Sequence, residues 1–141
     1  MAHKFPSKEW TDAYKDAVNG NEAYRVAGKE WTHGAVAMVV KADRSLGIEV
    51  DTGMILDVDS GSCHGTEFVH GLEACDGAPF IILAPYAQWK EVIQGGVDPI
   101  KAMMQGRLKL TKGHLPTMLR YVESSRQLVV SASRVPTEFL D

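Results

Sequence analysis

The chain is poor in cysteine and in long apolar runs. Its only two cysteines, Cys63 and Cys75, cannot form the disulfide framework of a small secreted protein. No apolar run approaches the roughly 18–20 residues of a transmembrane helix. The start, "MAHKFPSKEW", lacks the apolar core of a secretion signal. These absences predict a protein of the reducing cytoplasm and argue against stable membrane insertion.

Basic charge is not in excess either. The chain carries 15 Lys and Arg against 18 Asp and Glu, a net charge of −3, and its cations are scattered. Nucleic-acid binding normally needs a concentrated cationic face, so it is disfavoured as a main role. The sequence contains no internal repeat, low-complexity tract or linker, so residues 1–141 are predicted to form a single domain. A chain of this length buries roughly 70% of its unfolded surface, enough for a core and an internal cavity.

The first residues predict two helices. Ser7 follows Pro6 and precedes apolar residues at helical spacing, so its hydroxyl is expected to cap a helix that ends at Gly20. Asn21 is expected to cap a second helix that continues to about Trp31. Both helices therefore precede the region rich in β-branched residues.

Short apolar segments separated by polar or glycine-containing turns follow these helices. Residues 34–43, 46–51 and 53–59 have the composition of three strands in an antiparallel meander. The last two alternate apolar with polar residues, which is typical of a sheet with one buried and one solvated face. Residues 61–78 are the least periodic and predict a loop, with room for a short helix. The uniformly apolar residues 79–85 predict a buried strand.

The second half predicts helices around one more strand. Residues 86–95 have helical spacing, and Asp98 followed by Pro99 is expected to begin another helix that ends at Gly106. "RLKL", residues 107–110, reads as an edge strand, and a last helix is expected from about residue 114 to 134. The predicted fold class is therefore α+β, with helices on one face of a mainly antiparallel sheet of about five strands.

The sequence gives little indication of a metal site or a catalytic site. Cys63, His64, His70 and Cys75 are the nearest approach to a metal cluster, but zinc ligands usually come in pairs two to four residues apart, and this set has no such pair. A thiol nucleophile would need a basic partner that the spacing does not place. We therefore predict no metal site, no catalytic residue and no cofactor.

Carboxylates also lie on or beside the predicted strands. Asp51, Asp57 and Asp59 could in principle supply a pair for acid–base work. Solvated carboxylates on a strand face are far commoner, and that interpretation is preferred.

An apolar surplus remains on the predicted helices that flank the sheet. Methionine has a flexible thioether that adapts equally well to an irregular core and to ligands of varied shape. The pattern alone therefore leaves open whether these side chains fill a core or line a hollow. The residues in question are Trp89, Ile93, Met103, Met104, Met118 and Leu119.

Residues 79–119, "PFIILAPYAQWKEVIQGGVDPIKAMMQGRLKLTKGHLPTML", resemble the second half of a sterol carrier protein domain, the lipid-transfer family of type two. The shared pattern is a strand, a tryptophan-bearing helix, a glycine, an Asp-Pro helix start, a "GKLK"-like strand and a further glycine before an apolar helix. Two positions depart from this pattern. Arg107 stands where the family usually has lysine, and His114 stands where it often has aspartate. The matching positions are Trp89, Gly95, Asp98, Ala102, Gly106, Leu108, Lys109, Leu110 and Gly113.

The resemblance implies a stand-alone lipid-binding domain, of the microbial type, with an apolar tunnel between the sheet and its helices. The ligand would be a hydrophobic small molecule such as a fatty acid, an acyl-CoA or a sterol-like lipid, bound without catalysis. Removal of its apolar surface from water would drive binding, at roughly 25 cal/mol per Å² before ordering costs. The side chains expected to bind it are Trp89, Ile93, Met103, Met104, Leu108, Leu110, Met118, Leu119 and Val122.

Two other functions stay open at this point. The same pocket could serve an enzyme or enzyme subunit acting on an acyl or other apolar substrate, in which case Cys63, Cys75, Asp57 and Asp59 are the residues to test. Alternatively, an apolar groove could receive a helix or tail of a partner protein. Homodimer formation is also left open.

Overall fold

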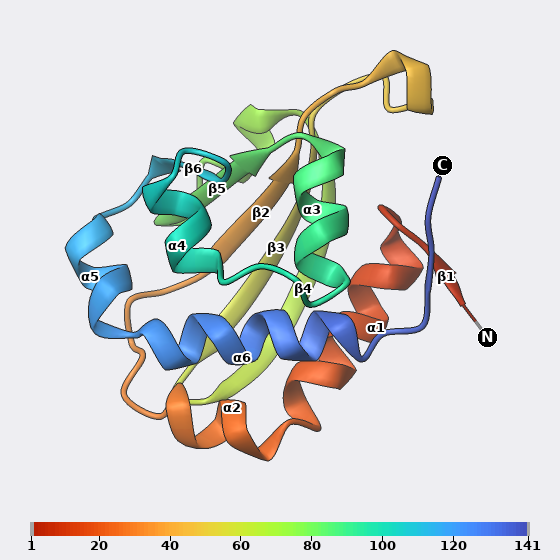
Figure 1. The fold of residues 1–141 in the computed structure, drawn as a ribbon. Helices are drawn as coiled ribbons and strands as arrows, with labels where there is room; N and C mark the ends of the chain where they lie inside the picture. Colours follow the sequence, from red (N-terminus) through yellow and green to blue (C-terminus); the bar gives the residue numbers. More distant parts are fainter. Residues whose placement is uncertain (1, 141) are drawn as a thin grey trace.

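The structure is a computed structural model that describes residues 2–140. One layer is a five-stranded sheet, and helices cover one of its faces (Figure 1). The strand order is β4-β3-β2-β5-β6, and only the pairing of β2 with β5 is parallel. The α+β prediction with a mainly antiparallel sheet is therefore confirmed. The strands are β2 (Val36–Val40), β3 (Thr52–Asp59), β4 (Ser62–His70), β5 (Phe80–Ala84) and β6 (Lys109–Lys112).

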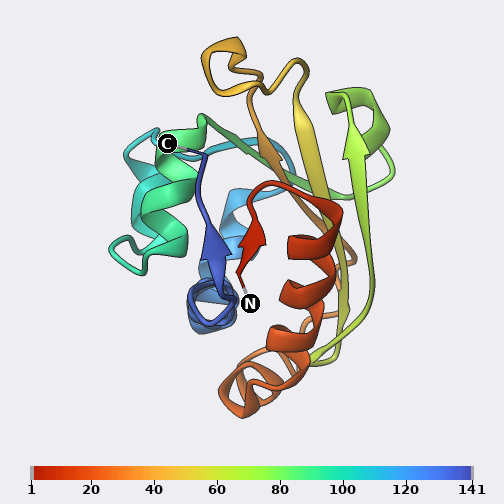
Figure 2. The same ribbon diagram turned by 90° about the vertical axis from the view of Figure 1, so that its right-hand side faces the viewer.

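The helical layer combines helices from the first 30 residues with helices from the second half of the chain. Helices α1 and α6 pack against each other, and α3 and α4 also pack on α6. A parallel pair of two-residue strands, β1 (His3–Lys4) and β7 (Thr137–Glu138), joins the terminal segments, which lie side by side in Figure 2. Among residues 2–140 no helix is long and apolar enough to cross a membrane. The helices are α1 (Lys8–Asn19), α2 (Glu22–Ala27), α3 (Tyr86–Ile93), α4 (Pro99–Met104), α5 (Leu115–Arg120) and α6 (Val122–Ser133).

Side-chain caps begin three of these helices as the sequence predicts. The Ser7 hydroxyl accepts a hydrogen bond from the Trp10 amide at 3.0 Å, and the Asn21 side chain accepts one from the Tyr24 amide at 3.3 Å. Asp98 accepts from the first free amides of α4, where Pro99 occupies the first turn. Each cap satisfies an amide that has no partner inside its own helix.

The predicted meander is wrong in its second strand. Residues 44–46 form a 3₁₀ turn, and Ile48 makes only an isolated bridge to Asp43. The Asp43 carboxylate accepts from the Ser45 amide and hydroxyl, and Gly47 has a φ of 82°, so local turn chemistry overrides the apolar alternation. The antiparallel meander in the structure consists of β2, β3 and β4, and β4 lies in the segment predicted as a loop. Because β4 is an edge strand with partly exposed side chains, its sequence is polar and lacks the apolar pattern that predicts a strand.

Helix and strand boundaries also differ in the second half. The last helix is not continuous, because Tyr121 leaves the helical conformation (φ −121°, ψ 42°) between α5 and α6. The edge strand begins at Lys109 rather than Arg107. Helix α2 ends at Ala27 rather than near Trp31. The buried strand and the helix that follows it are confirmed as β5 and α3.

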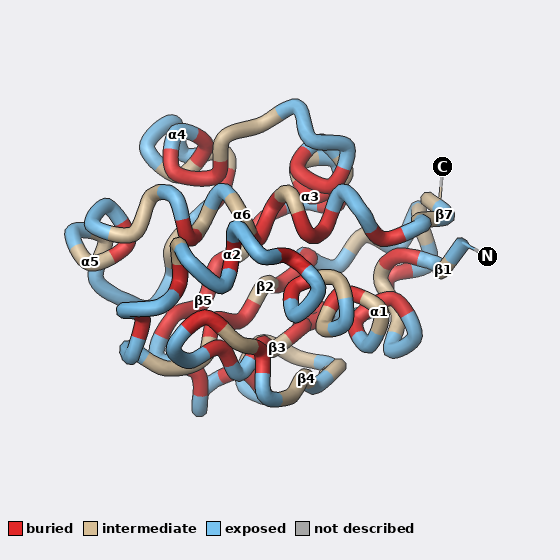
Figure 3. Tube along the Cα trace, turned by 90° about the horizontal axis from the view of Figure 1, so that it is seen from below, coloured by how far each residue is buried: buried red, intermediate tan, exposed pale blue. Residues whose placement is uncertain are grey.

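Apolar side chains are buried on both faces of the sheet. The main core lies between the sheet and the helices, where buried chain segments from both layers face one another (Figure 3). A smaller cluster on the opposite face contains Ala37, Val39 and Ile81 and is covered by the 3₁₀ turn Leu72–Cys75. The main core holds the candidate functional site.

Candidate functional site

An apolar cavity lies within the main core. The sheet supplies one wall through inward-facing residues of β2, β3 and β5, since alternate residues of a strand point to the same face. Met38 on β2 pairs directly with Met54 on β3 and with Ile82 on β5, which places these three side chains side by side. Val36 and Val58 extend the same wall.

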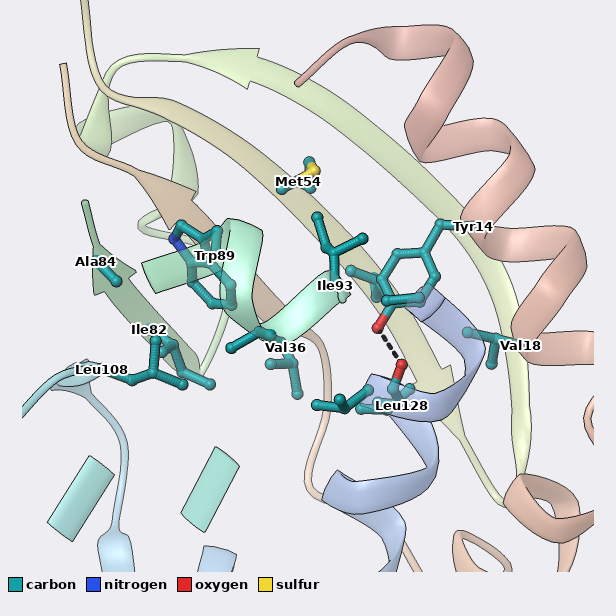
Figure 4. Packing of buried hydrophobic residues seen from close by; sticks show 14 of the residues in the cluster. Tyr14, Val18, Val36, Met54, Ile82, Ala84, Trp89, Ile93, Leu108 and Leu128 are labelled. Carbon is teal, nitrogen blue, oxygen red and sulfur yellow. Dashed lines mark hydrogen bonds between the residues drawn. The ribbon is translucent and has the colours of Figure 1, made fainter. Parts of the chain in front are cut away.

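Helices supply the other walls. Figure 4 shows Trp89 and Ile93 of α3, Tyr14 of α1 and Leu128 of α6 gathered opposite the strands. No Asp, Glu, Lys, Arg or His is among the described residues that line the cavity. The helix residues that line it are Trp10, Tyr14, Tyr24, Trp89, Val92, Ile93, Pro99, Met103, Met118, Ser124, Ser125, Leu128, Val129 and Ala132.

The polar atoms of the aromatic side chains are engaged in hydrogen bonds. The Tyr14 hydroxyl donates to the Leu128 carbonyl at 2.8 Å (Figure 4), and the Trp89 indole N–H donates to the Val39 carbonyl at 2.8 Å. Burial raises the pKa of Tyr14, and it raises the pKa of Tyr24 to about 12, so both phenols stay neutral. In residues 2–140 no buried side-chain nitrogen or oxygen lacks a partner. The surface left to face a ligand is therefore almost purely apolar.

The cavity is narrow in this conformation. Its volume is about 40 Å³, room for about three water molecules at roughly 10–15 Å³ each, and an alkyl chain of about ten carbons is several times larger than that. Side chains fill most of the space between the layers, so the open tunnel that the sequence resemblance implies stays a prediction. A ligand of that size requires the walls to move apart.

Methionine is concentrated in these walls. Four of the six methionines in the chain, Met38, Met54, Met103 and Met118, line the cavity. An unbranched thioether can change rotamer at low cost, so such a wall can conform to a flexible guest. The walls are therefore built from the side chains best suited to the movement that a ligand demands.

Five of the nine side chains expected to bind a ligand line the cavity: Trp89, Ile93, Met103, Leu108 and Met118. Their role in binding stays a prediction.

The other four expected binding residues do not line the cavity. Met104 is 68% exposed and Leu119 is 41% exposed, because each directly follows an inward-facing methionine and successive helical residues point about 100° apart. Leu110 and Val122 are half-buried and pack against the core.

The front half of the chain contributes lining residues that the sequence analysis did not single out. Trp10, Tyr14 and Tyr24 come from the first two helices, and Met38 and Met54 from the strands. The sequence resemblance is specific only after residue 79, so it did not mark them. The helical spacing of Trp10 and Tyr14 and the strand alternation around Met54 were the available signals.

The candidate catalytic residues lie outside the cavity lining, although Cys63 is in the main core and pairs across the sheet with the lining residue Val58. Burial raises the pKa of the Cys63 thiol and of the Cys75 thiol, and Cys75 belongs to the cluster on the opposite face of the sheet. Asp57 and Asp59 are exposed on β3. None of these four residues lines the cavity. Within residues 2–140, no three His, Cys, Asp or Glu side chains lie where they could hold a metal ion.

Comparison with known proteins places this fold among the sterol carrier proteins. A crystal structure of sterol carrier protein 2 is similar with a TM-score of 0.85 and 34% identity, covering 92% of this chain and 97% of that one. A solution structure of a conserved hypothetical protein from Thermus thermophilus has a TM-score of 0.85 and 33% identity, covering 94% of this chain and 90% of that one. Apo sterol carrier protein 2 from Yarrowia lipolytica, at 14% identity and a TM-score of 0.57 over 95% of this chain and 97% of that one, shares the fold.

The chain belongs to the sterol carrier protein family, as its 34% identity to sterol carrier protein 2 over nearly the whole of both chains shows. No family model matches the sequence, and a search of curated proteins finds no significant match.

Proposed function

We propose that this protein binds and carries a hydrophobic small molecule between its sheet and its helices, without catalysing a reaction. The observation that carries the proposal is the cavity wall, which is apolar and rich in methionine and includes no charged side chain among the described residues. Membership of the sterol carrier protein family supports the same function.

The energetics explain how a narrow cavity can serve a carrier. Each Å² of apolar ligand surface removed from water contributes roughly 25 cal/mol, and part of this gain offsets the cost of ordering the ligand and separating the walls. A fatty acid, an acyl-CoA and a sterol-like lipid share the apolar surface on which this reasoning depends. These ligands differ in shape, so comparing their affinities shows how far the cavity walls can separate.

Titration with dansyl-labelled undecanoic acid tests the proposal. We expect saturable binding of one molecule per chain with an affinity in the micromolar range or tighter, since roughly 8 kcal/mol of net binding free energy corresponds to that affinity. Competition with unlabelled palmitate, palmitoyl-CoA and cholesterol then identifies the preferred class. Absence of saturable binding with all of these ligands would contradict the proposal.

A matched pair of substitutions locates the binding. Met118→Gln introduces a polar amide into the cavity wall, whereas Met104→Gln makes the same change on an exposed side chain. Because an unpaired buried amide costs about 1–3 kcal/mol, we expect Met118→Gln to weaken binding roughly five-fold or more and Met104→Gln to leave it unchanged. Circular dichroism checks that both variants fold. Equal effects of the two substitutions would place the ligand elsewhere.

Enzyme activity in the same pocket is the rival explanation. Asp57 and Asp59 are exposed, and Cys75 lies on the opposite face of the sheet. Cys63 is in the main core but does not line the cavity. Substituting Cys75 by Ser is therefore expected to leave ligand binding unchanged. Turnover of an acyl substrate that disappears in this variant while binding persists would favour the enzyme.

A further inference from the structure

A second hollow opens to solvent beside the cavity. This outer groove, about 420 Å³ in volume, lies between α6 and the segment that joins α3 to α4. In Figure 1 that segment runs alongside α6. Pro99 and Val129 line both the outer groove and the cavity, so the two spaces share part of a wall.

An ion pair spans this groove. The Arg126 Nε on α6 donates to the Asp98 Oδ2 at 2.9 Å, while Asp98 Oδ1 accepts from the amides of Ile100 and Lys101 and so caps α4. The pair thus joins the start of α4 to the side of α6. Burial alone would raise the pKa of Asp98, but the Arg126 guanidinium and the two amides lower it below its usual value, so the carboxylate stays charged.

The backbone of the segment before Asp98 is held by α3 rather than by α6. Gly95 has a φ of +83° and lies in open space, with no atom within 4 Å of where a Cβ would be. The backbone amides of Gly95 and Gly96 donate to Val92 and Glu91 in α3 rather than to α6. In contrast, the sheet side of the cavity is closed by continuous backbone hydrogen bonding between strands. The walls can therefore separate more easily at the groove than at the sheet.

Arg126 is also suited to receive an anion. It is the only cationic side chain among the described residues that line the outer groove, and its side chain is 50% exposed. Glu123, on the same helix, lies 3.7 Å from Arg126 Nη1 and completes its charged surroundings. A guanidinium presents several N–H donors, so it can exchange one carboxylate for another without losing its charge-assisted hydrogen bonds.

We propose that the outer groove is the mouth of the cavity, that the Asp98–Arg126 pair holds it closed, and that a long-chain carboxylate takes the place of Asp98 on Arg126 as its alkyl tail passes between Pro99 and Val129. This inference rests on the proposed function, because it names the ligand class and the route for the same cavity. The carboxylate then stays at the groove while the tail occupies the space behind it.

Stopped-flow fluorescence with two probes tests the inference: dansyl-labelled undecanoic acid and the matching alcohol. Asp98→Asn removes the charge but keeps an equally good helix cap, so the fold is retained. Breaking a partly exposed ion pair changes an equilibrium by up to about five-fold. We therefore expect Asp98→Asn to take up both probes about two- to five-fold faster and to bind the acid more tightly.

Arg126→Gln separates the two roles of the arginine. It also opens the pair, so the alcohol is expected to enter faster, but the acid loses its partner and binds several-fold more weakly than to the wild-type protein. Arg44→Gln is the matched control, because Arg44 lies in the 44–46 turn and makes an exposed ion pair with Glu49. It should change neither rate nor affinity.

A covalent block supplies an independent arm. Ser133 lines the groove and is exposed, so Ser133→Cys can be labelled with a bulky maleimide while Cys63 and Cys75 are buried. The label should slow uptake, whereas the same label on Ser45→Cys should not. Unchanged rates in every groove variant, with wild-type affinity intact, would overturn the inference and leave the proposed function standing. Failure of the wild-type protein to bind either probe, and also palmitate, palmitoyl-CoA and cholesterol, would instead refute the proposed function.

Discussion

Leu128→Ala enlarges the cavity from the α6 side. It should lower the free energy of unfolding and, at the same time, lower the free energy needed to separate the cavity walls. The Leu128 side chain lines the cavity, and its carbonyl is fixed by the Tyr14 hydroxyl. Removing three buried carbon atoms costs about 0.8 kcal/mol each, or roughly 2.4 kcal/mol in total, and the added cavity brings the loss to about 3 kcal/mol. Urea unfolding measures this decrease in the free energy of unfolding.

Ligand is expected to restore stability to Leu128→Ala by more than it stabilises the wild-type protein. A ligand at about 100 times its dissociation constant stabilises a native state by roughly 2.7 kcal/mol. In the wild-type protein part of the binding free energy is spent on separating the walls, and the smaller side chain removes some of that cost. The expected result is tighter binding of palmitate and a larger ligand-induced rise in melting temperature.

Leu56→Ala is the control for this experiment. Leu56 is fully buried in the same core but does not line the cavity, so its truncation should cost a similar amount, about 2–5 kcal/mol, without improving ligand binding. Equal ligand-induced gains in the two leucine variants would refute the reasoning, as would loss of binding in a folded Leu128→Ala.

Three further outcomes follow from the same contacts. Tyr14→Phe should lower the free energy of unfolding by about 1 kcal/mol, because it removes a buried neutral hydrogen bond between α1 and α6; urea titration measures it, and no change would contradict the contact. Asp98→Ala should cost about 1 kcal/mol more than Asp98→Asn, which keeps the cap. The pKa of Asp98 is lower in the folded state, so its stabilising contribution is present above the unfolded pKa of about 3.9 and is lost as pH falls below it. Wild-type stability should therefore fall more steeply in acid than that of Asp98→Asn. Cys63 and Cys75 should react with a thiol reagent at pH 7 only after unfolding, because both are buried and burial raises the pKa of each thiol; fast labelling of the native protein would contradict this.

Local chemistry made much of the fold predictable. Ser7, Asn21 and Asp98 each precede a helix with a side chain that can accept from its first amides, and all three do so. The uninterrupted apolar run of β5 is typical of a buried central strand, and β5 pairs on both sides. These features depend on residues close in sequence.

Long-range packing limited the rest. The residues of the turn that follows Asp43 alternate apolar with polar as a strand does, although they form a turn. The residues of β4 lack that pattern, although they form a strand, because its outer face is polar. Met103 and Met104 are identical in type and adjacent, yet only the helix orientation decides that the first faces the cavity. The cavity volume depends on how side chains of both layers interlock, which residue spacing does not encode.

Methyl NMR of the methionines tests most directly whether a ligand occupies the space between sheet and helices. The protein would be labelled with ¹³C at the methionine methyl groups and titrated with a fatty acid. The signals of Met38, Met54, Met103 and Met118 are expected to shift together and saturate, while that of exposed Met104 stays in place. A shift confined to Met104, or saturable binding that leaves all four cavity signals unmoved, would contradict this expectation.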